Sequence, residues 1–403
     1  MKPWLTIVGC GDDGLAGLAP AARLLLDNAA LIVAPQRMLG DPALAGKICT
    51  AWPSPFSDGI EQLLARRGSG VCVLATGDPM HFGVGATLAQ HVPLEEMRII
   101  PAPSAFSLAA ARLAWPLQQV DCISLHGRPA ALIEPFIAPD ARILALGEGA
   151  GTLQQVSARL EARGFEQSRI TVLEHMGGAR ERVLTLNVDR ALQSDIADFS
   201  TLAIECIAGP HARILPRMPG LPDEAFSHDG QLTKREVRAA TLAALAPYAG
   251  ALLWDVGAGC GSVAIEWMRA ARHARAVAIE RNEARLAMIA ENALALGVPQ
   301  LSIAPGRAPD MFDELATPDA IFLGGGVSDE TVFDACWARL RANGMLVANA
   351  VTLEGETALI ARQKIHGGEL VRMDISILAD VGPYRALKPR MSVLQWRVRK
   401  GAS

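Results

Sequence analysis

Short apolar runs alternate with amphipathic stretches along the first half of the chain. This pattern predicts strands that alternate with helices, which is typical of βαβ units and a largely parallel sheet. The later strands, with one more at 182–186, could instead form a mixed second sheet. The expected strands are 5–8, 31–34, 71–75, 98–101, 142–146, 170–173 and 202–207, and the expected helices are 21–26, 60–66, 104–113 and 152–163.

The second half alternates more regularly, and it ends in two stretches of alternating apolar and polar residues. Five strands followed by this pair predict a seven-strand sheet, which the last pair can close as an antiparallel hairpin. The whole chain is therefore expected to be an α/β protein. The expected helices are 234–245, 263–271, 283–296, 329–340 and 354–366, and the expected strands are 252–256, 276–280, 301–304, 320–323, 345–349, 370–378 and 392–399.

A proline-rich segment separates the two halves. It contains Pro210, Pro216, Pro219 and Pro222, with Gly209 and Gly220 among them. Proline interrupts both helix and ladder hydrogen bonding, so this composition indicates a linker. We interpret 1–208 as one domain, 209–226 as the linker and 227–403 as a second domain.

A glycine-rich loop, DVGAGCGS at 255–262, lies between the first strand of the second half and the next helix. Its glycines are Gly257, Gly259 and Gly261. Glycines there allow a tight turn and a close approach of the backbone to a ligand. A dinucleotide-binding loop would have its third glycine at Ser262, and Asp255 would repel a pyrophosphate. A ligand with an amino group, a carboxylate and a ribose, but no phosphate, fits better, and S-adenosylmethionine is such a ligand. Glu280 ends the following strand, where it is placed for ribose hydroxyls.

The helix that precedes this loop opens with Thr233, Lys234, Arg235 and Glu236. Thr233 and Glu236 have the spacing of a capping box, which by itself accounts for both residues. The alternative is that this helix lies over the cofactor, with Thr233 touching it and the basic residues facing an acidic substrate.

Two later turns complete the candidate site of the second half. Residues 306–308 follow the third strand, where adenine contacts usually lie. An acidic residue often occupies the middle place, which Arg307 does not match, so the backbone or Ala308 is the expected contact. The glycine-rich loop, the helix after it and Glu280 together indicate a seven-strand methyltransferase. Residues 319–326 run from the fourth strand into a glycine-rich turn, where that fold commonly brings the substrate and the methyl group of the cofactor together.

The first half carries its own loops at the expected strand ends. Residues 8–14 match G-x-G-x-x-G, but no acidic residue ends the second strand, and Asp12 and Asp13 would repel a pyrophosphate. NAD binding is therefore disfavoured. Further loops lie at 76–85 and at 101–104, and loops at the carboxyl ends of strands line the usual binding crevice of an α/β sheet.

Composition and charge narrow the function further. The net charge of −4 gives no basic excess, which argues against a nucleic-acid partner. The seven cysteines have no CxxC spacing and the histidines are scattered, so no disulfide framework, zinc site or other metal site is expected. No apolar run is long enough to span a membrane, and the start of the chain does not have the pattern of a signal peptide. We expect a cytoplasmic protein and a homo-oligomer.

The motifs carry a family resemblance. The first half resembles the tetrapyrrole methylase family through 8–14, Thr76-Gly77-Asp78-Pro79, 101–104 and the segment Ser124-Leu125-His126-Gly127-Arg128. The second half is similar to the decarboxylating methylases of the same pathway through 233–238, 255–261 and 319–325. The order of the two on one chain resembles the fused precorrin methylases of vitamin B12 biosynthesis.

The resemblance implies a tetrapyrrole methylase fold of two α/β subdomains, followed by a Rossmann-like seven-strand methyltransferase domain. It implies two S-adenosylmethionine sites, methylation of precorrin-6Y at carbons 5 and 15, and loss of carbon dioxide from the acetate on carbon 12, giving precorrin-8X. The second domain would perform one methylation and the decarboxylation.

The expected cofactor contacts are Gly9, Gly11, Gly77, Asp78 and Ser104 in the first half, and Thr233, Asp255, Gly257, Gly259, Gly261, Glu280 and Ala308 in the second. A macrocycle with many carboxylates needs basic residues around its rim, and the candidates are Arg128, Lys234 and Arg238.

Two alternatives stay open at this point. The chain could be an RNA or protein methyltransferase with an N-terminal recognition domain, or a single-site methylase whose other half is a scaffold. The sequence identifies no acid or base for the decarboxylation. It leaves open the order of the two methylations and whether the substrate contains cobalt.

Overall fold

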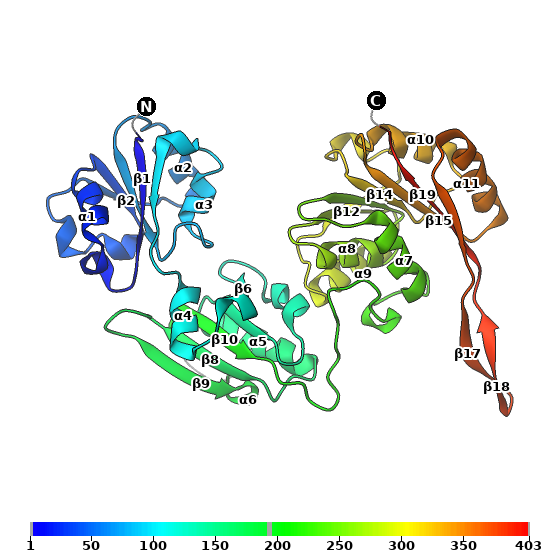
Figure 1. Ribbon diagram of the computed structural model, residues 1–403, viewed down its shortest axis with the longest axis horizontal. Coiled ribbons are helices and arrows are strands. Elements are labelled where there is room, and N and C mark those ends of the chain that lie inside the picture. Colours follow the sequence, from blue (N-terminus) through cyan, green and yellow to red (C-terminus); the bar gives the residue numbers. More distant parts are fainter. Residues whose placement is uncertain (1–2, 192–195, 402–403) are drawn as a thin grey trace. The chain divides into compact units, whose positions relative to one another are not determined.

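The computed structural model describes residues 3–191 and 196–401. The chain forms two compact units (Figure 1). One unit comprises Met1–Ala130 and Ile137–Arg213, and the other comprises Ala131–Phe136 and Ile214–Ser403. The short segment 131–136 therefore belongs to the second unit although its neighbours in sequence belong to the first.

The first sheet of the first unit is parallel throughout, as the alternation of strands and helices predicts. Its strands in spatial order are β3 (Cys49–Ala51), β2 (Leu31–Ala34), β4 (Val71–Thr76), β1 (Leu5–Cys10) and β5 (Met97–Ile100). Helix α1 (Pro20–Asp27) packs on one face, and α2 (Phe56–Leu64) and α3 (Val84–Leu88) pack on the other. Because β4 and β5 both pair with β1, the loops that leave these three strands emerge side by side.

The second sheet of the first unit is mixed, which the sequence left as an alternative. Its order is β6 (Asp121–Ser124), β7 (Arg142–Leu146), β10 (Ser200–Glu205), β8 (Arg169–Glu174) and β9 (Arg182–Asn187). Only the β6–β7 pair is parallel. Helix α4 (Ala105–Leu113) packs on this sheet through Phe106 and Ala109, and the remaining helices are α5 (Ala150–Ala162) and α6 (Val188–Ala191).

Strands β3 and β6 were not expected from the sequence. Strand β3 has three residues and none of them is buried, and β6 begins with Asp121 and Cys122, which are only half-buried. Neither therefore shows the continuous apolar run that marks a central strand of a parallel sheet.

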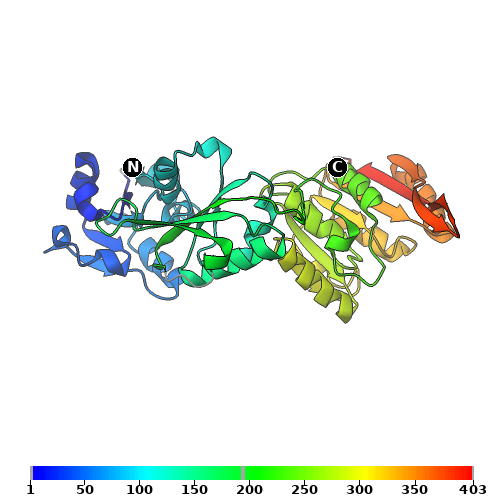
Figure 2. The same cartoon turned by 90° about the horizontal axis from the view of Figure 1, so that it is seen from below.

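The second unit contains the expected seven-strand sheet. The strands in spatial order are β13 (Ser302–Pro305), β12 (Arg275–Glu280), β11 (Leu252–Val256), β14 (Ala320–Leu323), β15 (Met345–Ala350), β19 (Val393–Arg399) and β16 (Glu369–Met373). The helices are α7 (Arg235–Leu245), α8 (Ser262–Ala270), α9 (Glu283–Ala295), α10 (Glu330–Arg339) and α11 (Leu353–His366). Helices α7, α8 and α9 share one core with the sheet, and α10 and α11 share the other, so both faces are covered (Figure 2).

The end of the chain differs from the expectation in one respect. The stretch 370–378 is not one strand: β16 ends at Met373, and the chain then enters a two-stranded ribbon of β17 (Ser376–Val381) and β18 (Tyr384–Pro389) (Figure 1). The expected antiparallel pairing holds between β16 and β19. A period-2 pattern marks extended chain but not the point where the chain leaves one sheet for another, which explains the error.

The proline-rich segment packs against the second unit over much of its length. Leu215, Leu221 and Phe226 are buried in the core that α7 and α8 share. Their burial shows that apolar residues between the prolines have a structural role in that unit.

All seven cysteines are free thiols, and five of them are buried. Burial raises the pKa of Cys72 and of Cys336 to about 12, which keeps these thiols protonated and unreactive. No helix within 3–191 or 196–401 is long and apolar enough to cross a membrane.

Candidate functional site

A cavity of about 980 Å³ lies in the second unit, at the carboxyl ends of its parallel strands. The loops after β11, β12, β13 and β14 form one side of it, and α7 with the ends of β15 and β19 forms the other. This is where an α/β sheet normally binds a small molecule. Of the expected contacts, the cavity lining includes Thr233, Lys234, Gly257, Gly259, Glu280 and Ala308.

The two lining glycines of the loop after β11 have different reasons to be glycine. Gly257 has φ of +73°, and a Cβ there would lie 2.9 Å from the Cα of Gly325, so the loop touches the turn after β14. Gly259 has φ of +59°, and its nearest heavy atom to such a Cβ is Gln231 O at 3.4 Å. A larger side chain at Gly259 would therefore extend toward the cavity.

Glu280 lies at the bottom of the loop that follows β12 and is held firmly. Its Oε2 accepts a hydrogen bond of 2.9 Å from Gly259 N, and its Oε1 accepts from Arg281 N and Asn282 N at 2.9 and 3.0 Å. The side chain is buried but lines the cavity. An oriented carboxylate with lone pairs facing a cavity suits a ligand that carries two ribose hydroxyls.

Asp255 and Gly261 were expected to contact the cofactor, but neither lines the cavity. Asp255 is 1% exposed, and its Oδ2 accepts from Ala264 N at 3.0 Å. Within the described part of the chain its Oδ1 has no hydrogen-bond partner. Burial raises the pKa of Asp255 to about 7, the hydrogen bond from Ala264 opposes this rise, and the charge of Glu280 adds to it. Asp255 thus connects the start of the loop to α8 on the side away from the cavity.

Gly261 precedes α8 and has φ of +79°. A Cβ on this residue would lie 3.1 Å from Cγ2 of Ile289 on α9. The glycine is required by the backbone conformation and by the packing of α9, and it does not reach the cavity.

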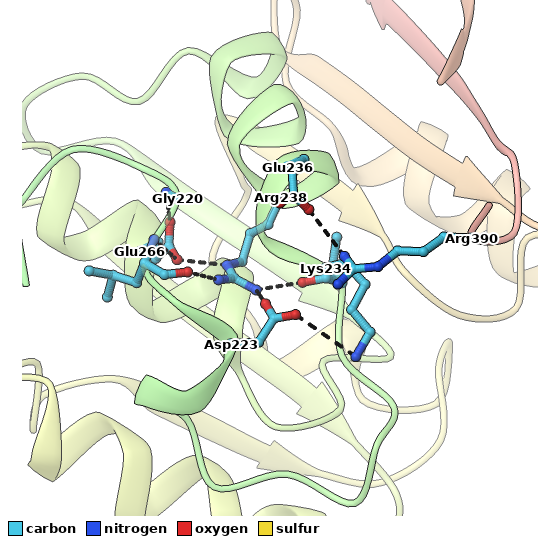
Figure 3. Close-up of polar contacts among 9 residues, drawn as sticks. Gly220, Asp223, Lys234, Glu236, Arg238, Glu266 and Arg390 are labelled. Atoms are coloured by element: carbon cyan, nitrogen blue, oxygen red, sulfur yellow. Dashed lines mark hydrogen bonds and ion pairs between the residues drawn. The ribbon is translucent and has the colours of Figure 1, made fainter. Parts of the chain in front are cut away.

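Arg238 was expected to face the substrate, and this prediction is wrong. Its side chain is fully buried, and its Nε donates to Glu266 Oε1 at 2.6 Å (Figure 3). Its Nη1 donates to Asp223 Oδ1 at 3.2 Å. Arg238 is the fourth residue of α7, and its side chain points into the protein toward Glu266 on α8. The sequence pattern did not predict a buried acidic residue at this place.

The expected capping box is also wrong. Helix α7 begins at Arg235 with Lys234 as its N-cap, and no side chain caps it. Glu236 instead forms an ion pair with Arg390, whose Nη1 donates to Glu236 Oε2 at 3.1 Å (Figure 3). The box fails because Thr233 lies one residue before the position that could cap the helix, and both Thr233 and Lys234 line the cavity.

Two cationic side chains at this end of the cavity come from distant parts of the chain. Lys234 Nζ lies 3.9 Å from Asp223 Oδ2, the same carboxylate that pairs with Arg238. Arg390 follows β18 and lines the cavity as well. Sequence reasoning missed Arg390, because the pairing of the ribbon that carries it has no local signal.

Three other arginines also line the cavity, namely Arg281, Arg285 and Arg307. Arg307 is exposed and lies 3.6 Å from Asp329, the N-cap of α10. Arg285 is engaged by Asp229 and Gln231 on the loop before α7. The cavity wall therefore carries a marked excess of guanidinium groups, which suits an anionic ligand.

In the first unit the expected loops converge at the carboxyl ends of β1, β4 and β5. A Cβ on Gly9 would collide with Gly77 O and Ala102 N, and Gly77 itself has φ of +61°. Gly77 N donates to Cys10 O at 2.7 Å. Three backbones can meet this closely only because residue 9 lacks a side chain.

The other expected contacts of the first unit have local roles. Asp78 Oδ1 accepts from Met80 N at 2.8 Å, and Ser104 caps α4 by accepting from Ser107 N at 3.1 Å. A Cβ on Gly11 would meet the carboxylate of Asp13. These bonds fix the conformation of the loops.

Arg128 lies beside these loops. It is exposed, and its guanidinium carbon lies 5.9 Å from the ring centre of Phe82, which belongs to the loop after β4. Sequence reasoning missed Arg37, whose Nη2 donates to Thr76 Oγ1 at 2.7 Å and whose Nη1 lies 3.4 Å from Asp12 Oδ1. Among the described residues, no group of three or more His, Cys, Asp or Glu side chains could hold a metal ion.

Two family models match the chain, one for each half. Residues 4–191 match the tetrapyrrole (corrin/porphyrin) methylases, and residues 224–400 match the precorrin methyltransferase domain. The expected α/β fold class, a tetrapyrrole methylase fold followed by a methyltransferase domain, is confirmed.

Curated relatives match both halves together. A Sinorhizobium protein named precorrin-6Y C(5,15)-methyltransferase [decarboxylating] is 46% identical over 406 residues, which is 100% of this chain and 97% of the relative. A Mycobacterium tuberculosis protein of the same name is 38% identical and covers 98% of this chain and 100% of its own length. The solved C-terminal domain of precorrin-6Y C5,15-methyltransferase from Rhodobacter capsulatus is 42% identical, with a TM-score of 0.44, over 46% of this chain and 100% of that domain.

Proposed function

The chain belongs to the precorrin-6Y C(5,15)-methyltransferase (decarboxylating) family, and we propose that it methylates precorrin-6Y at carbons 5 and 15 and releases carbon dioxide from the acetate on carbon 12. The product would be precorrin-8X, an intermediate of cobalamin biosynthesis. As a methyltransferase of this family the protein uses S-adenosylmethionine. The observation that carries the proposal is the cavity at the carboxyl ends of the parallel strands, where Gly259 N donates to Glu280 and several basic side chains belong to the lining.

The cavity of the second unit fits S-adenosylmethionine. Glu280 would accept the ribose hydroxyls, the backbone around Gly259 would approach the amino-acid portion, and Ala308 would lie against the adenine. The bound cofactor supplies a methyl group that its sulfonium has already activated. The protein therefore needs mainly to align donor and acceptor carbon, for which the turn Gly324–Gly326 leaves room.

We place a second S-adenosylmethionine site in the first unit. The close approach of the backbones at Gly9, Gly77 and Ala102 supports it, because such a cradle forms at the strand ends where α/β sheets bind ligands. Asp78 and Ser104 lie on the same loops, although their side chains are partly used in local hydrogen bonds. The two units would each perform one methylation, and the second would also decarboxylate.

The substrate carries many carboxylates, and the basic side chains are suited to hold them. In the second unit Lys234 remains a candidate and Arg390 replaces Arg238, because Lys234 and Arg390 line the cavity and Arg238 does not. Arg128 keeps this role in the first unit, where it is exposed beside Phe82. The acidic partners Asp223 and Glu236 hold the two cations in place before the substrate arrives.

The relatives that match the full chain favour a precorrin over RNA or protein as the substrate. A net charge of −4 also disfavours a nucleic-acid partner, and we keep the expectations of a cytoplasmic location and of a homo-oligomer as proposals. The ribbon supports self-association, because several of its large apolar side chains are exposed. They are Leu378, Val381, Tyr384 and Leu387.

The test of the proposed function is mass spectrometry of the product formed from precorrin-6Y and S-adenosylmethionine, with carbon dioxide release measured in parallel. The wild-type protein should add two methyl groups and lose one carboxyl group. Gly259→Val should add one methyl group and release no carbon dioxide, because the new side chain occupies the cavity of the second unit. Gly250→Val is the matched control: Gly250 also has positive φ, at +78°, but no heavy atom lies within 4 Å of its Cβ position.

Asp78→Arg should have the converse effect, because it places a cation beside a sulfonium cofactor in the first unit. Its product should be decarboxylated and singly methylated. Titration calorimetry should give about two equivalents of S-adenosylmethionine per chain for the wild type. A single equivalent would favour the alternative in which one half is a scaffold, and normal decarboxylation by Gly259→Val would contradict the assignment of that step to the second unit.

A further inference from the structure

A triad of uncharged polar side chains lies beneath one end of the cavity in the second unit. Asn349 is near the end of β15, Gln395 is on β19 directly opposite it in the antiparallel ladder, and Thr241 is on α7. Thr241 is fully buried and Gln395 is 2% exposed, whereas Asn349 is half-buried and lines the cavity. The proposed function so far assigns no role to these three residues.

The hydrogen bonds of the triad determine the orientation of each amide. Gln395 Nε2 donates to Thr241 Oγ1 at 3.1 Å and to Asn349 Oδ1 at 3.0 Å. Both of its N–H groups are thereby used, so Asn349 must present its oxygen to Gln395. The Asn349 amino group then donates one hydrogen to Thr241 Oγ1 at 2.9 Å. A primary amide carries two N–H donors, so among the described residues one N–H of the Asn349 side chain has no acceptor and remains for a ligand.

Asn349 is also level with the point where the methyl group is transferred. Leu323 of β14 pairs with Ala348 of β15 in the parallel ladder, so Gly324 and Asn349 follow at the same height. Adjacent strands lie about 4.8 Å apart. The glycine turn that begins at Gly324 lines the cavity, and it is where substrate and methyl group meet in the proposed function.

The triad lies at the end of the cavity opposite the cofactor. Glu280 ends β12, and β11 and β14 separate it from β15 in the sheet. Other lining residues at or next to the ends of β15, the ribbon and β19 are Val351, Ile375, Arg390 and Val393. A single neutral donor among apolar side chains, with an arginine nearby, suits a carboxylate attached to a large apolar ring.

We propose that the free N–H of Asn349 donates a hydrogen bond to a carboxylate of the macrocyclic substrate, and that Thr241 and Gln395 are positioning residues that hold the amide in this orientation. The inference rests on the proposed function, because it assigns part of the substrate site in the same cavity. It gives a reason for the polar side chains of Gln395 and Thr241, which are buried beside the apolar core between α7 and the sheet.

The test measures carbon dioxide release with precorrin-6Y and, separately, the binding of S-adenosylmethionine. Asn349→Ala should lower kcat/KM for the precorrin about 10- to 100-fold, which is the effect of losing a hydrogen bond to a charged group. Most of the loss should be in KM, because the carboxylate is bound in the ground state and in the transition state alike. The dissociation constant for S-adenosylmethionine should change less than about twofold.

A matched pair of variants at Thr241 separates positioning from folding. Thr241→Val removes the acceptor while keeping the shape, so it should raise KM in the same direction as Asn349→Ala. Thr241→Ser keeps the hydroxyl and should restore a KM close to that of the wild type. A purely structural role would lower the melting temperature and the cofactor affinity together, whereas the proposed role raises KM in variants that still bind the cofactor normally.

The outcomes distinguish this inference from the proposed function. If the wild type does not convert precorrin-6Y, the proposed function fails, and the inference is then judged by fluorescence titration with uroporphyrin, a macrocycle with eight carboxylates. Weaker uroporphyrin binding by Asn349→Ala and Thr241→Val, but not by Thr241→Ser, supports the inference. If the wild type is active and Asn349→Ala keeps its KM and kcat within twofold, or if cofactor affinity falls in parallel, the inference is wrong.

Discussion

At the scale of single residues, the second unit contains a buried ion pair between Arg238 and Glu266, which costs desolvation of both charges. Both side chains are fully buried. Glu266 also accepts hydrogen bonds from Gly220 N at 2.6 Å and Leu221 N at 3.0 Å (Figure 3). One carboxylate thus joins α7, α8 and the proline-rich segment, and its charge is compensated at the same time. Removing one partner of such a pair leaves a buried charge.

Glu266→Gln should therefore destabilise the protein by about 3 kcal/mol, although the two side chains have nearly the same volume. The matched control is Glu369→Gln, because Glu369 pairs with Arg397 at the surface and exposed pairs contribute little. Urea unfolding of the two variants measures the difference. Equal losses of stability would show that the buried pair contributes no more to the free energy of unfolding than the exposed pair does.

Asp255 gives a second prediction at this scale, about pH. Its pKa is about 7 in the folded protein and near 3.8 in the unfolded chain. Between these values the folded state keeps a proton that the unfolded state has released, so wild-type stability falls as the pH rises through this window. Asp255→Asn cannot ionise, and its stability relative to the wild type should rise by roughly 2 kcal/mol between pH 5 and pH 8.

The measurement is chemical unfolding at several pH values without added ligand. Asp229→Asn is the control, because the hydrogen bond from Gln231 N and the side chain of Arg285 hold the pKa of Asp229 below its usual value. Both states of Asp229 are ionised above pH 5, so its difference from the wild type should stay constant over the same range. A constant difference for Asp255→Asn would contradict the raised pKa.

At the scale of elements, the ribbon of β17 and β18 is the feature that completes one end of the cavity. The ladder between β16 and β19 does not depend on it, since that pairing runs from Glu369 with Arg397 to Met373 with Val393. The ribbon returns the chain at Arg390, whose N–H donates to Ile375 O at 2.8 Å, and both residues line the cavity. An insertion between two strands thereby supplies a basic side chain to the site.

Two arginines of this region allow a matched comparison. Arg390→Gln should raise KM for the precorrin about tenfold, because it removes a cation that lines the cavity. Arg385→Gln should leave KM within about twofold, because Arg385 lies on β18 away from the lining. Steady-state kinetics of the two variants are the measurement, and equal effects would mean that the ribbon acts only through its net charge.

At the scale of the whole molecule, the chain joins two units that each have their own sheets and cores. Apart from the short segment 131–136, the chain passes from the first unit to the second between Arg213 and Ile214, before most of the prolines. Leu215 and Leu221 are buried in the second unit, and Glu266 holds the backbone at Gly220 and Leu221. The prolines therefore shape a segment that packs on the second unit over much of its length.

Separate expression of 1–213 and 214–403 should give two folded fragments, each binding about one equivalent of S-adenosylmethionine. A third fragment, 222–403, should be markedly less stable than 214–403, because it lacks the buried Leu215 and Leu221. Thermal unfolding and calorimetry measure both properties. If 1–213 and 214–403 aggregate while the full chain is soluble, the two units depend on each other for folding.

The sequence by itself determined most of the strands of the large sheets and the glycine-rich loops that follow them. Strands such as 31–34, 142–146, 252–256 and 320–323 have the predicted bounds, because an apolar run between turn residues is a local signal. The same holds for the loop at Gly257 and Gly259, where the conformation of the backbone itself requires glycine. These features follow from residues that are neighbours in the chain.

Only the tertiary structure decided which side chains face the cavity. Arg238 and Arg390 are both arginines next to other polar residues in the sequence, yet one is buried against Glu266 on α8 and the other lines the cavity from the segment after β18. Asn349 owes its orientation to a residue on another strand and one on another helix. A side chain's direction depends on partners that are distant in sequence, and the pattern of hydrophobic and polar positions carries no information about such partners.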